Sequence, residues 1–172
     1  MISLRDDIDP NEFEARARRV RLILMDCDGV LTDGRLYFGS SGEMIKVFDV
    51  KDGQGIGNWH ALGFQTGIVT GRAADEILAK RAGELQILYL RTRSADKARD
   101  VREIAAAAGI ELNETAFVGD DIGDIPAMET VGFPVIVADA AREVCHHALA
   151  QTSNRGGRGA VRELIDYLIS LK

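Results

Sequence analysis

Two aspartates follow directly on an apolar run near the start of the chain. The segment VRLILMDCDGVLTDG, residues 20–34, passes from Leu, Ile, Leu and Met straight into Asp26 and Asp28. Burying an unpaired carboxylate costs far more free energy than a strand gains by including it. The segment is therefore either a polar turn that closes a buried strand or a strand that positions charge for chemistry.

More polar residues of the kinds that do chemistry come after other apolar runs. They are Thr70-Gly71-Arg72, Lys97, Gly119-Asp120-Asp121 and Asp124. Taken singly, each has an ordinary structural explanation, such as a turn hydroxyl, a solvated lysine or an acid at the start of a helix. Their chemical meaning depends on whether the fold brings them together with Asp26 and Asp28.

Short apolar runs and helical patterns alternate along the chain. Runs typical of buried strands span 20–26, 64–71, 86–90, 115–121 and 133–139, and helical patterns span 72–85, 95–109, 122–129, 140–149 and 160–172. This alternation predicts an α/β fold, a three-layer sandwich with helices on both faces of a parallel sheet. Such sheets place their sites at the carboxyl ends of the strands, so the polar groups are expected to converge on one edge.

Convergence of several carboxylates would demand a cation. All-oxygen ligands suit Mg²⁺, which binds one or two carboxylates and leaves positions for water and a phosphate oxygen. Lys97 and Thr70 would then donate to the other phosphate oxygens, together with backbone N–H groups of the turns. The pattern predicts a Mg²⁺ site that handles a phosphate.

These residues resemble the four motifs of the haloacid dehalogenase-like phosphohydrolases, in order. The motifs are Asp26-Cys27-Asp28-Gly29, Thr70, Lys97 and Gly119–Asp124, and the resemblance runs from about Val20 to the C-terminus. Finer segments resemble one branch, the 3-deoxy-D-manno-octulosonate 8-phosphate (KDO 8-phosphate) phosphatases of lipopolysaccharide precursor synthesis. These segments are DGVLTDG (28–34), VKDGQGI (50–56), VTGR (69–72), VGDDIGDIPAM (118–128), VADA (137–140) and GGRGAVRE (156–163). The resemblance implies a Rossmann-like sheet and hydrolysis of KDO 8-phosphate.

The resemblance also implies a role for each motif residue. The implied catalytic residues are Asp26, Asp28, Thr70 and Lys97. The implied metal ligands are Asp26, the backbone carbonyl of Asp28, and Asp120. Asp121 and Asp124 would orient Lys97 or metal-bound water. Asp26 would attack phosphorus and form an aspartyl-phosphate. Asp28 would protonate the leaving alcohol and then accept a proton from the hydrolytic water.

Substrate recognition follows the family pattern less closely. The implied substrate-binding residues are Gly71, Arg72, Lys97 and Arg158, with Arg72 facing a carboxylate of the sugar. Arg158 belongs to NRGGRGAVRE (154–163), a flexible basic tail that could fold over a neighbouring subunit's substrate. The family's second arginine could be Lys80 or Arg81, and the loop before Lys97 adds Arg91 and Arg93. Which sugar acid is bound stays open, a sialic-acid or KDN 9-phosphate type included.

Residues 34–50 interrupt the alternation. Two β-rich arms flank Gly39-Ser40-Ser41-Gly42, which predicts a protruding hairpin. Its arms carry Leu36, Phe38, Ile45, Val47 and Phe48, which predict an association surface. The insertions before Thr70 and Lys97 are too short for a cap domain, so the site would be open in a monomer. The resemblance implies a homotetramer in which neighbouring subunits complete each site.

Length and composition limit the remaining possibilities. A chain of 172 residues predicts one domain over 1–172, with the hairpin at 34–50 and the Gly-rich tail and last helix at 154–172. A net charge of −6 argues against a nucleic-acid surface, and no apolar stretch approaches the roughly 20 residues of a membrane span. With two cysteines and no signal-peptide pattern, we expect a cytoplasmic protein that acts on a small sugar phosphate.

Two other classes of protein compete with a phosphatase. A non-catalytic haloacid dehalogenase-like subunit could lack motif acids, yet Asp26, Asp28 and Asp120 are all present. A phospho-acceptor receiver domain would not need Asp28. The segment DGQGIGNW (52–59) lacks the spacing of a dinucleotide fingerprint, so we expect its glycines to lend flexibility beside the site.

Overall fold

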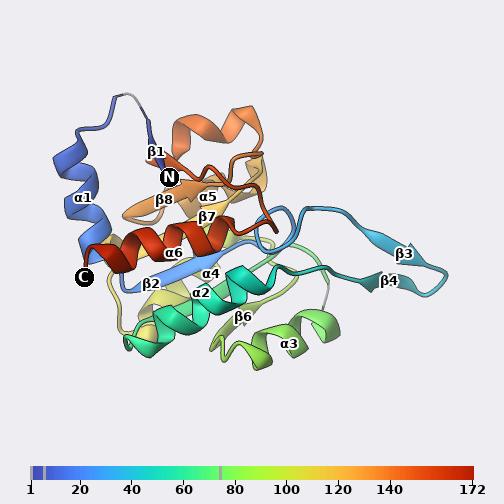
Figure 1. Cartoon of the computed structure of the whole chain (residues 1–172). Helices are drawn as coiled ribbons and strands as arrows, with labels where there is room; N and C mark the ends of the chain where they lie inside the picture. Colours follow the sequence, from blue (N-terminus) through green and yellow to red (C-terminus); the bar gives the residue numbers. More distant parts are fainter. Residues whose placement is uncertain (1, 6, 74) are drawn as a thin grey trace.

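A computed structural model describes residues 2–5, 7–73 and 75–172, which are built around a seven-stranded sheet. The strands are β1 (Ser3–Leu4), β2 (Leu22–Met25), β5 (Gln65–Val69), β6 (Tyr89–Arg91), β7 (Thr115–Gly119), β8 (Phe133–Ile136) and β9 (Ala150–Gln151), in the order β1-β9-β8-β7-β2-β5-β6. All neighbouring strands are parallel except β1, which runs antiparallel to β9. The α/β fold with a mostly parallel sheet is confirmed (Figure 1).

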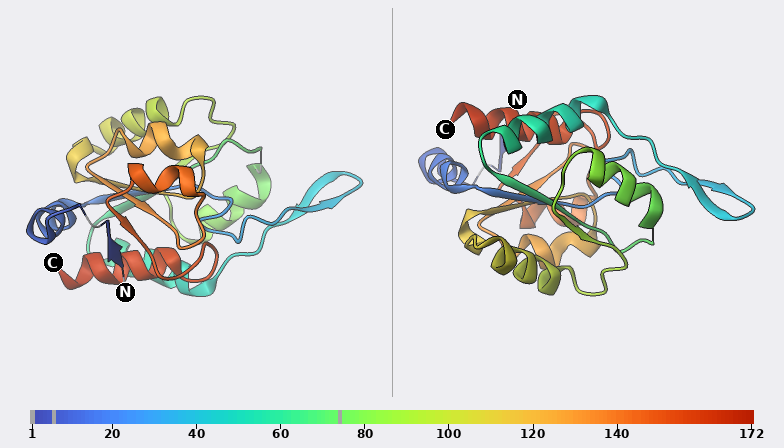
Figure 2. Two further views of the ribbon diagram at one scale, coloured as in Figure 1. Left: turned by 90° about the horizontal axis from the view of Figure 1, so that it is seen from above. Right: turned by 90° about the horizontal axis from the view of Figure 1, so that it is seen from below.

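Helices cover both faces of the sheet. They are α1 (Pro10–Arg19), α2 (Val50–Ala61), α3 (Asp75–Glu84), α4 (Lys97–Ala108), α5 (Ile125–Met128) and α6 (Ala160–Ser170), with 3₁₀ turns η1 (Leu112–Glu114), η2 (Ile122–Asp124) and η3 (Arg142–His147). Figure 2 shows α2 and α6 on one face and α4 and α5 on the other. Within the described residues, no helix is long and apolar enough to cross a membrane.

The central strand β2 contributes side chains to both layers. Ile23 and Met25 pack in the cluster that includes α2 and α6, whereas Leu22 and Leu24 pack in the cluster that includes α4 and α5. Side chains alternate between the faces of a strand, and here both faces are covered. This explains why the run before Asp26 is apolar without interruption.

Some predicted elements are wrong in type or position. Residues 140–149 do not form an α-helix; only the 3₁₀ turn η3 forms, because the chain must return at once to add β9 to the edge of β8. The strand predicted at 86–90 is displaced to β6, since Gln86 has a left-handed φ of 56° and still belongs to the turn after α3.

Among the described residues, the elements that the sequence analysis missed include α1, β1 and β9. Helix α1 has ordinary signals: Asp9 accepts a hydrogen bond from the N–H of Asn11, and Pro10 occupies the first helical position. Strands β1 and β9 contain two residues each, too few to produce a recognisable alternation.

A hairpin of β3 (Tyr37–Gly39) and β4 (Gly42–Ile45) projects from the body of the molecule, as Figures 1 and 2 show. Its turn lies at Ser40–Ser41, as predicted. Phe48 departs from the prediction: it packs against the core, and the guanidinium carbon of Arg81 lies 5.6 Å from its ring centroid. The exposed apolar side chains of the arms are Leu36, Tyr37, Phe38, Met44, Ile45 and Val47.

Two glycines of DGQGIGNW, Gly53 and Gly55, allow close packing. They lie inside α2, and a Cβ on Gly55 would lie 3.2 Å from the Cα of Arg162 on α6. A Cβ on Gly53 would lie 2.6 Å from Nη2 of Arg81. The expectation of flexibility is wrong because α6 and Arg81 approach this helix more closely than a side chain would permit.

Two alanine substitutions in α2 test this packing. Gly57→Ala is expected to stabilise the protein by about 1 kcal/mol, because alanine favours helix and nothing described lies within 4 Å of the new Cβ. Gly55→Ala gains the same propensity but crowds α6, so it is expected to be less stable than Gly57→Ala by about 1 kcal/mol or more. Urea denaturation measures both; equal stabilisation would contradict the packing argument.

Candidate active site

The parallel sheet brings the predicted residues to one edge. Asp26 directly follows β2, its N–H donates to the carbonyl of Val118 on β7 at 3.0 Å, and Asp120 directly follows β7. On the other side of β2, Thr70 follows β5. A pocket of about 600 Å³ opens there, and its lining includes Asp26, Asp28, Thr70, Gly71, Arg72 and Lys97.

Lys97 bridges two of the acids. It begins α4, which Asp96 caps by accepting from the N–H of Arg99, and its side chain is 12% exposed. Its Nζ donates to Oδ1 of Asp26 at 2.9 Å and to Oδ1 of Asp124 at 2.7 Å. Burial by itself would lower the pKa of Lys97, but Asp26 and Asp124 outweigh burial and raise it. Lys97 is therefore a cation at neutral pH.

Asp124 is buried at this edge and accepts hydrogen bonds through both of its carboxylate oxygens. While its Oδ1 accepts from Lys97, its Oδ2 accepts from the N–H groups of Asp120 at 2.9 Å and Asp121 at 3.2 Å. It thus contacts Lys97, one of the two kinds of partner expected for it. The carboxylate of Asp121 instead accepts from the N–H of Ile122 at 2.7 Å, so its described contact is a cap on η2 rather than a bond to Lys97.

The acidic cluster fits a divalent cation. Asp26, Asp120 and Asp124 each offer a carboxylate oxygen, and these oxygens lie within 4.8 Å of one another. Oδ1 of Asp120 is buried and has no hydrogen-bond partner among the described residues. Since both oxygens of Asp124 already accept hydrogen bonds, Asp26 and Asp120 are the better ligands. Hard oxygen donors of this kind suit Mg²⁺.

The pKa values record the same excess of negative charge. Burial first, and then the charges of Asp26 and Asp124, raise the pKa of Asp120 to about 8. Burial also raises the pKa of Asp26 to about 6, although Lys97 opposes the rise. One lysine is therefore too little positive charge for these carboxylates, and a bound cation would supply the remainder.

Glycines allow the close approach of the two acidic loops. Gly29 has a φ of +96°, and a Cβ at this position would lie 2.0 Å from Oδ2 of Asp120. A Cβ on Gly119 would lie 2.7 Å from Cβ of Asp124. A side chain at Gly29 would displace Asp120 and one at Gly119 would displace Asp124, which explains the glycine beside each pair of acids.

Thr70 and Cys27 lie near Asp26 but differ in chemistry. Thr70 is 1% exposed, and its Oγ1 accepts from the N–H of Arg72 at 3.2 Å, which leaves its hydroxyl proton for an anion in the pocket. Cys27 is fully buried, and burial, followed by the charge of Asp28, raises the pKa of its thiol. Cys27 is a core residue rather than a nucleophile.

The sequence analysis missed two residues, Glu43 and Lys46, which the hairpin brings to Asp28. The side chain of Lys46 is 1% exposed, and its Nζ donates to Oδ1 of Asp28 and lies 2.8 Å from Oε1 of Glu43. Oε2 of Glu43 accepts from Nη2 of Arg72 at 3.3 Å. A signal was available: two charged residues three apart in an otherwise apolar arm.

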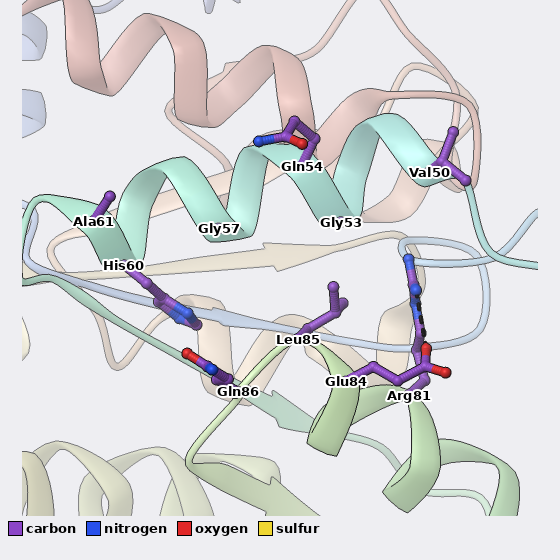
Figure 3. A pocket seen from close by; sticks show the side chains of 10 residues that line it. All are labelled: Val50, Gly53, Gln54, Gly57, His60, Ala61, Arg81, Glu84, Leu85 and Gln86. Carbon is purple, nitrogen blue, oxygen red and sulfur yellow. Dashed lines mark hydrogen bonds and ion pairs between the residues drawn. The ribbon is translucent and has the colours of Figure 1, made fainter.

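The other predicted basic residues lie outside this pocket. Arg158 is exposed, with Nη2 at 3.6 Å from Oδ2 of Asp33. Arg81 instead lines a hollow of about 590 Å³ between α2 and the end of α3, where it pairs with Glu84 (Figure 3). Within the described part of the chain, none of Lys80, Arg81, Arg91 and Arg93 lines the pocket that contains Asp26.

The Gly-rich segment expected to be flexible is packed against the body of its own chain. The N–H of Gly157 donates to the carbonyl of Val30 at 2.8 Å, and that of Gly156 to Oδ1 of Asp139 at 3.0 Å. A Cβ on Gly156 would lie 1.7 Å from the carbonyl oxygen of Gly29. These glycines allow residues 154–159 to support the loop that follows Asp26.

Comparisons with known proteins agree with this geometry. Residues 81–164 match the haloacid dehalogenase-like hydrolase family. A 3-deoxy-D-manno-octulosonate 8-phosphate phosphatase from Yersinia pestis is 40% identical over 154 residues, which cover 90% of this chain and 82% of that protein. The corresponding Escherichia coli enzyme is 39% identical over 155 residues, with the same shares.

The chain belongs to the KDO 8-phosphate phosphatase family of haloacid dehalogenase-like hydrolases.

Solved structures of family members have the same fold. The Moraxella catarrhalis enzyme, in complex with magnesium, phosphate and KDO, has a TM-score of 0.90 at 32% identity and covers 95% of this chain and 94% of its own. The cobalt-bound Haemophilus influenzae enzyme has a TM-score of 0.88 at 33% identity, covering 91% of each chain. These two relatives thus contain magnesium and cobalt, respectively.

Removing the Asp120 carboxylate should alter how Mg²⁺ stabilises the protein. Because folding raises the pKa of Asp120 from 3.8 to about 8, the metal-free folded state retains a proton that the unfolded chain has lost. The contribution of Asp120 to the stability of the metal-free protein therefore falls as pH rises from about 4 to about 8. Mg²⁺ competes with that proton, so the rise in Tm on adding Mg²⁺ is expected to be larger at pH 8.5 than at pH 6.

The Asp120→Asn variant is compared with the wild type, and the Tm of each is measured by thermal melting with Mg²⁺ or with EDTA. It is expected to have a higher Tm than the wild type in EDTA at pH 8.5 and to lose most of the rise with Mg²⁺. An unchanged Mg²⁺ response in Asp120→Asn would place the metal elsewhere.

Proposed function

We propose that this chain is a Mg²⁺-dependent phosphomonoesterase that converts KDO 8-phosphate to KDO and phosphate. The observation that carries the proposal is the edge where Lys97 bridges Asp26 and Asp124, beside Oδ1 of Asp120, which has no hydrogen-bond partner among the described residues. The resemblance to family members acting on KDO 8-phosphate supports the choice of substrate.

The chain's own residues account for phosphoryl transfer. A carboxylate oxygen of Asp26 attacks phosphorus, the bond to the sugar oxygen breaks, and Asp28 gives that oxygen a proton. In the second step Asp28 accepts a proton from water as the water oxygen attacks phosphorus and Asp26 is released. Lys97 and Thr70 offset the charge of the phosphoryl oxygens. Mg²⁺, held by Asp26, the backbone carbonyl of Asp28, and Asp120, would reduce the repulsion between nucleophile and phosphate.

Arg72 is proposed to bind the sugar's carboxylate. It lines the pocket with Asp28, is 39% exposed, and keeps its Nη2 at 3.3 Å from Glu43. A guanidinium can hold a carboxylate through two parallel hydrogen bonds, which a lysine cannot reproduce. This contact would select an acidic sugar over a neutral one.

Phosphate release from a panel of sugar phosphates tests the function. The wild type with Mg²⁺ is expected to prefer KDO 8-phosphate and to lose activity in EDTA. The Asp26→Asn variant is expected to have a kcat lower by about 10³-fold or more, because the nucleophile is gone. A better rate with a nine-carbon sugar-acid phosphate would keep the chemistry and change the substrate. A folded, Mg²⁺-binding protein with no turnover would instead be a non-catalytic subunit.

We also propose that the protein is a cytoplasmic homotetramer joined through the hairpin. The arms expose apolar side chains, with Phe38 at 65%, Met44 at 59% and Ile45 at 55%. Apolar side chains on a projecting ribbon favour burial against another copy. A neighbouring subunit would also enclose a site that has no cap domain of its own.

Charge on the hairpin should separate the subunits. Phe38→Asp is expected to shift the wild-type tetramer to smaller species in light scattering coupled to size exclusion, because a carboxylate would be buried in the interface. Leu88→Asp is the matched control, since Leu88 is 72% exposed but lies outside the hairpin. A monomeric wild type, or dissociation by both variants, would contradict the proposed interface.

A further inference from the structure

The hairpin delivers a buried cation to the acid–base residue. Lys46 directly follows β4, and its side chain is 1% exposed, which is rare for a lysine. Its Nζ contacts Oδ1 of Asp28 and, at 2.8 Å, Oε1 of Glu43. An ammonium group is buried only when such partners offset its desolvation, so both carboxylates are required to keep it in place.

The two carboxylate oxygens of Asp28 have different contacts. Lys46 donates to Oδ1, whereas Oδ2 is buried with no hydrogen bond among the described residues, and Nε of Arg72 lies 3.8 Å away. The ammonium of Lys46 therefore limits rotation of the carboxylate, and Oδ2 is the oxygen that no donor occupies. A proton carried to the leaving group needs a carboxylate held in a fixed orientation.

We propose that Lys46 is a positioning residue that holds Asp28 for proton transfer, with Glu43 securing Lys46. This inference rests on the proposed phosphatase function, in which Asp28 protonates the sugar oxygen and later takes a proton from water. Lys46 touches neither substrate nor phosphorus; it acts through Asp28. The hairpin thereby serves catalysis within its own subunit, in addition to any contact between subunits.

The effect of Lys46→Met on substrates with different leaving groups distinguishes this role from a structural one. A sugar alkoxide must be protonated as it leaves, whereas p-nitrophenolate leaves without a proton. Lys46→Met is therefore expected to lower kcat/KM for KDO 8-phosphate by about 100-fold and to change kcat/KM for p-nitrophenyl phosphate by less than about 3-fold. The ratio of the two is unaffected by the fraction of folded enzyme, since misfolding lowers both equally.

The kcat and KM for p-nitrophenyl phosphate provide a second test of this role. Hydrolysis of the aspartyl-phosphate still needs Asp28 as a base, while kcat/KM reports only the steps up to phosphoryl transfer. Lys46→Met is thus expected to lower kcat and KM together for this substrate. The matched control is Lys51→Met, which removes an exposed lysine five residues later and is expected to match the wild type.

A double-mutant cycle shows whether Lys46 acts through Asp28. In an Asp28→Asn background, Lys46→Met is expected to change kcat/KM for KDO 8-phosphate by less than about 3-fold. Should Lys46→Met fail to fold, Glu43→Gln tests the same support and is expected to lower the sugar-to-aryl ratio by about 10-fold.

The outcomes distinguish this inference from the proposed function. Equal losses on both substrates, or a full further loss in the Asp28→Asn background, would overturn the role of Lys46 and leave the phosphatase standing. If the wild type prefers another sugar phosphate, that substrate replaces KDO 8-phosphate in the ratio. No hydrolysis of any phosphomonoester by the wild type would overturn the function and this inference together.

Discussion

Repulsion among buried carboxylates is the constraint on which the active edge depends. Asp26, Asp120 and Asp124 bring oxygens within 4.8 Å of one another, and among the described side chains one cation, Lys97, donates to two of them. The raised pKa values of Asp26 and Asp120 show that one ammonium does not balance this charge. The edge is therefore built to receive a cation and, with it, an anion such as a phosphate.

The parallel sheet makes such crowding possible. Its strands end in register, so loops distant in sequence meet at one edge, and the buried layers on both faces hold them there. Glycines complete the arrangement, because Gly29 lets its loop pass against Asp120 and Gly156 lets the C-terminal segment support Gly29. Close backbone approach, rather than mobility, is the common function of these glycines.

The hairpin joins two requirements in one element. Its outer side chains are apolar and exposed, which favours association with another copy. Its second arm also carries Glu43 and Lys46, whose buried charges meet Asp28 and Arg72. The proposed assembly and the proposed positioning of Asp28 would thus be physically linked, because both depend on the conformation of the same ribbon.

The sequence by itself determined the α/β class and the parallel sheet, because the alternation of apolar runs and helical patterns can be read locally. It also determined the edge where Asp26, Thr70, Lys97 and Asp120 meet, because each of these residues follows the end of a strand or the loop after it. Only the tertiary structure decided the partners. It placed Asp124 on Lys97, reduced 140–149 to a 3₁₀ turn, and buried Lys46 against Asp28. Such contacts join residues far apart in the chain, so they depend on how elements pack, which no local pattern records.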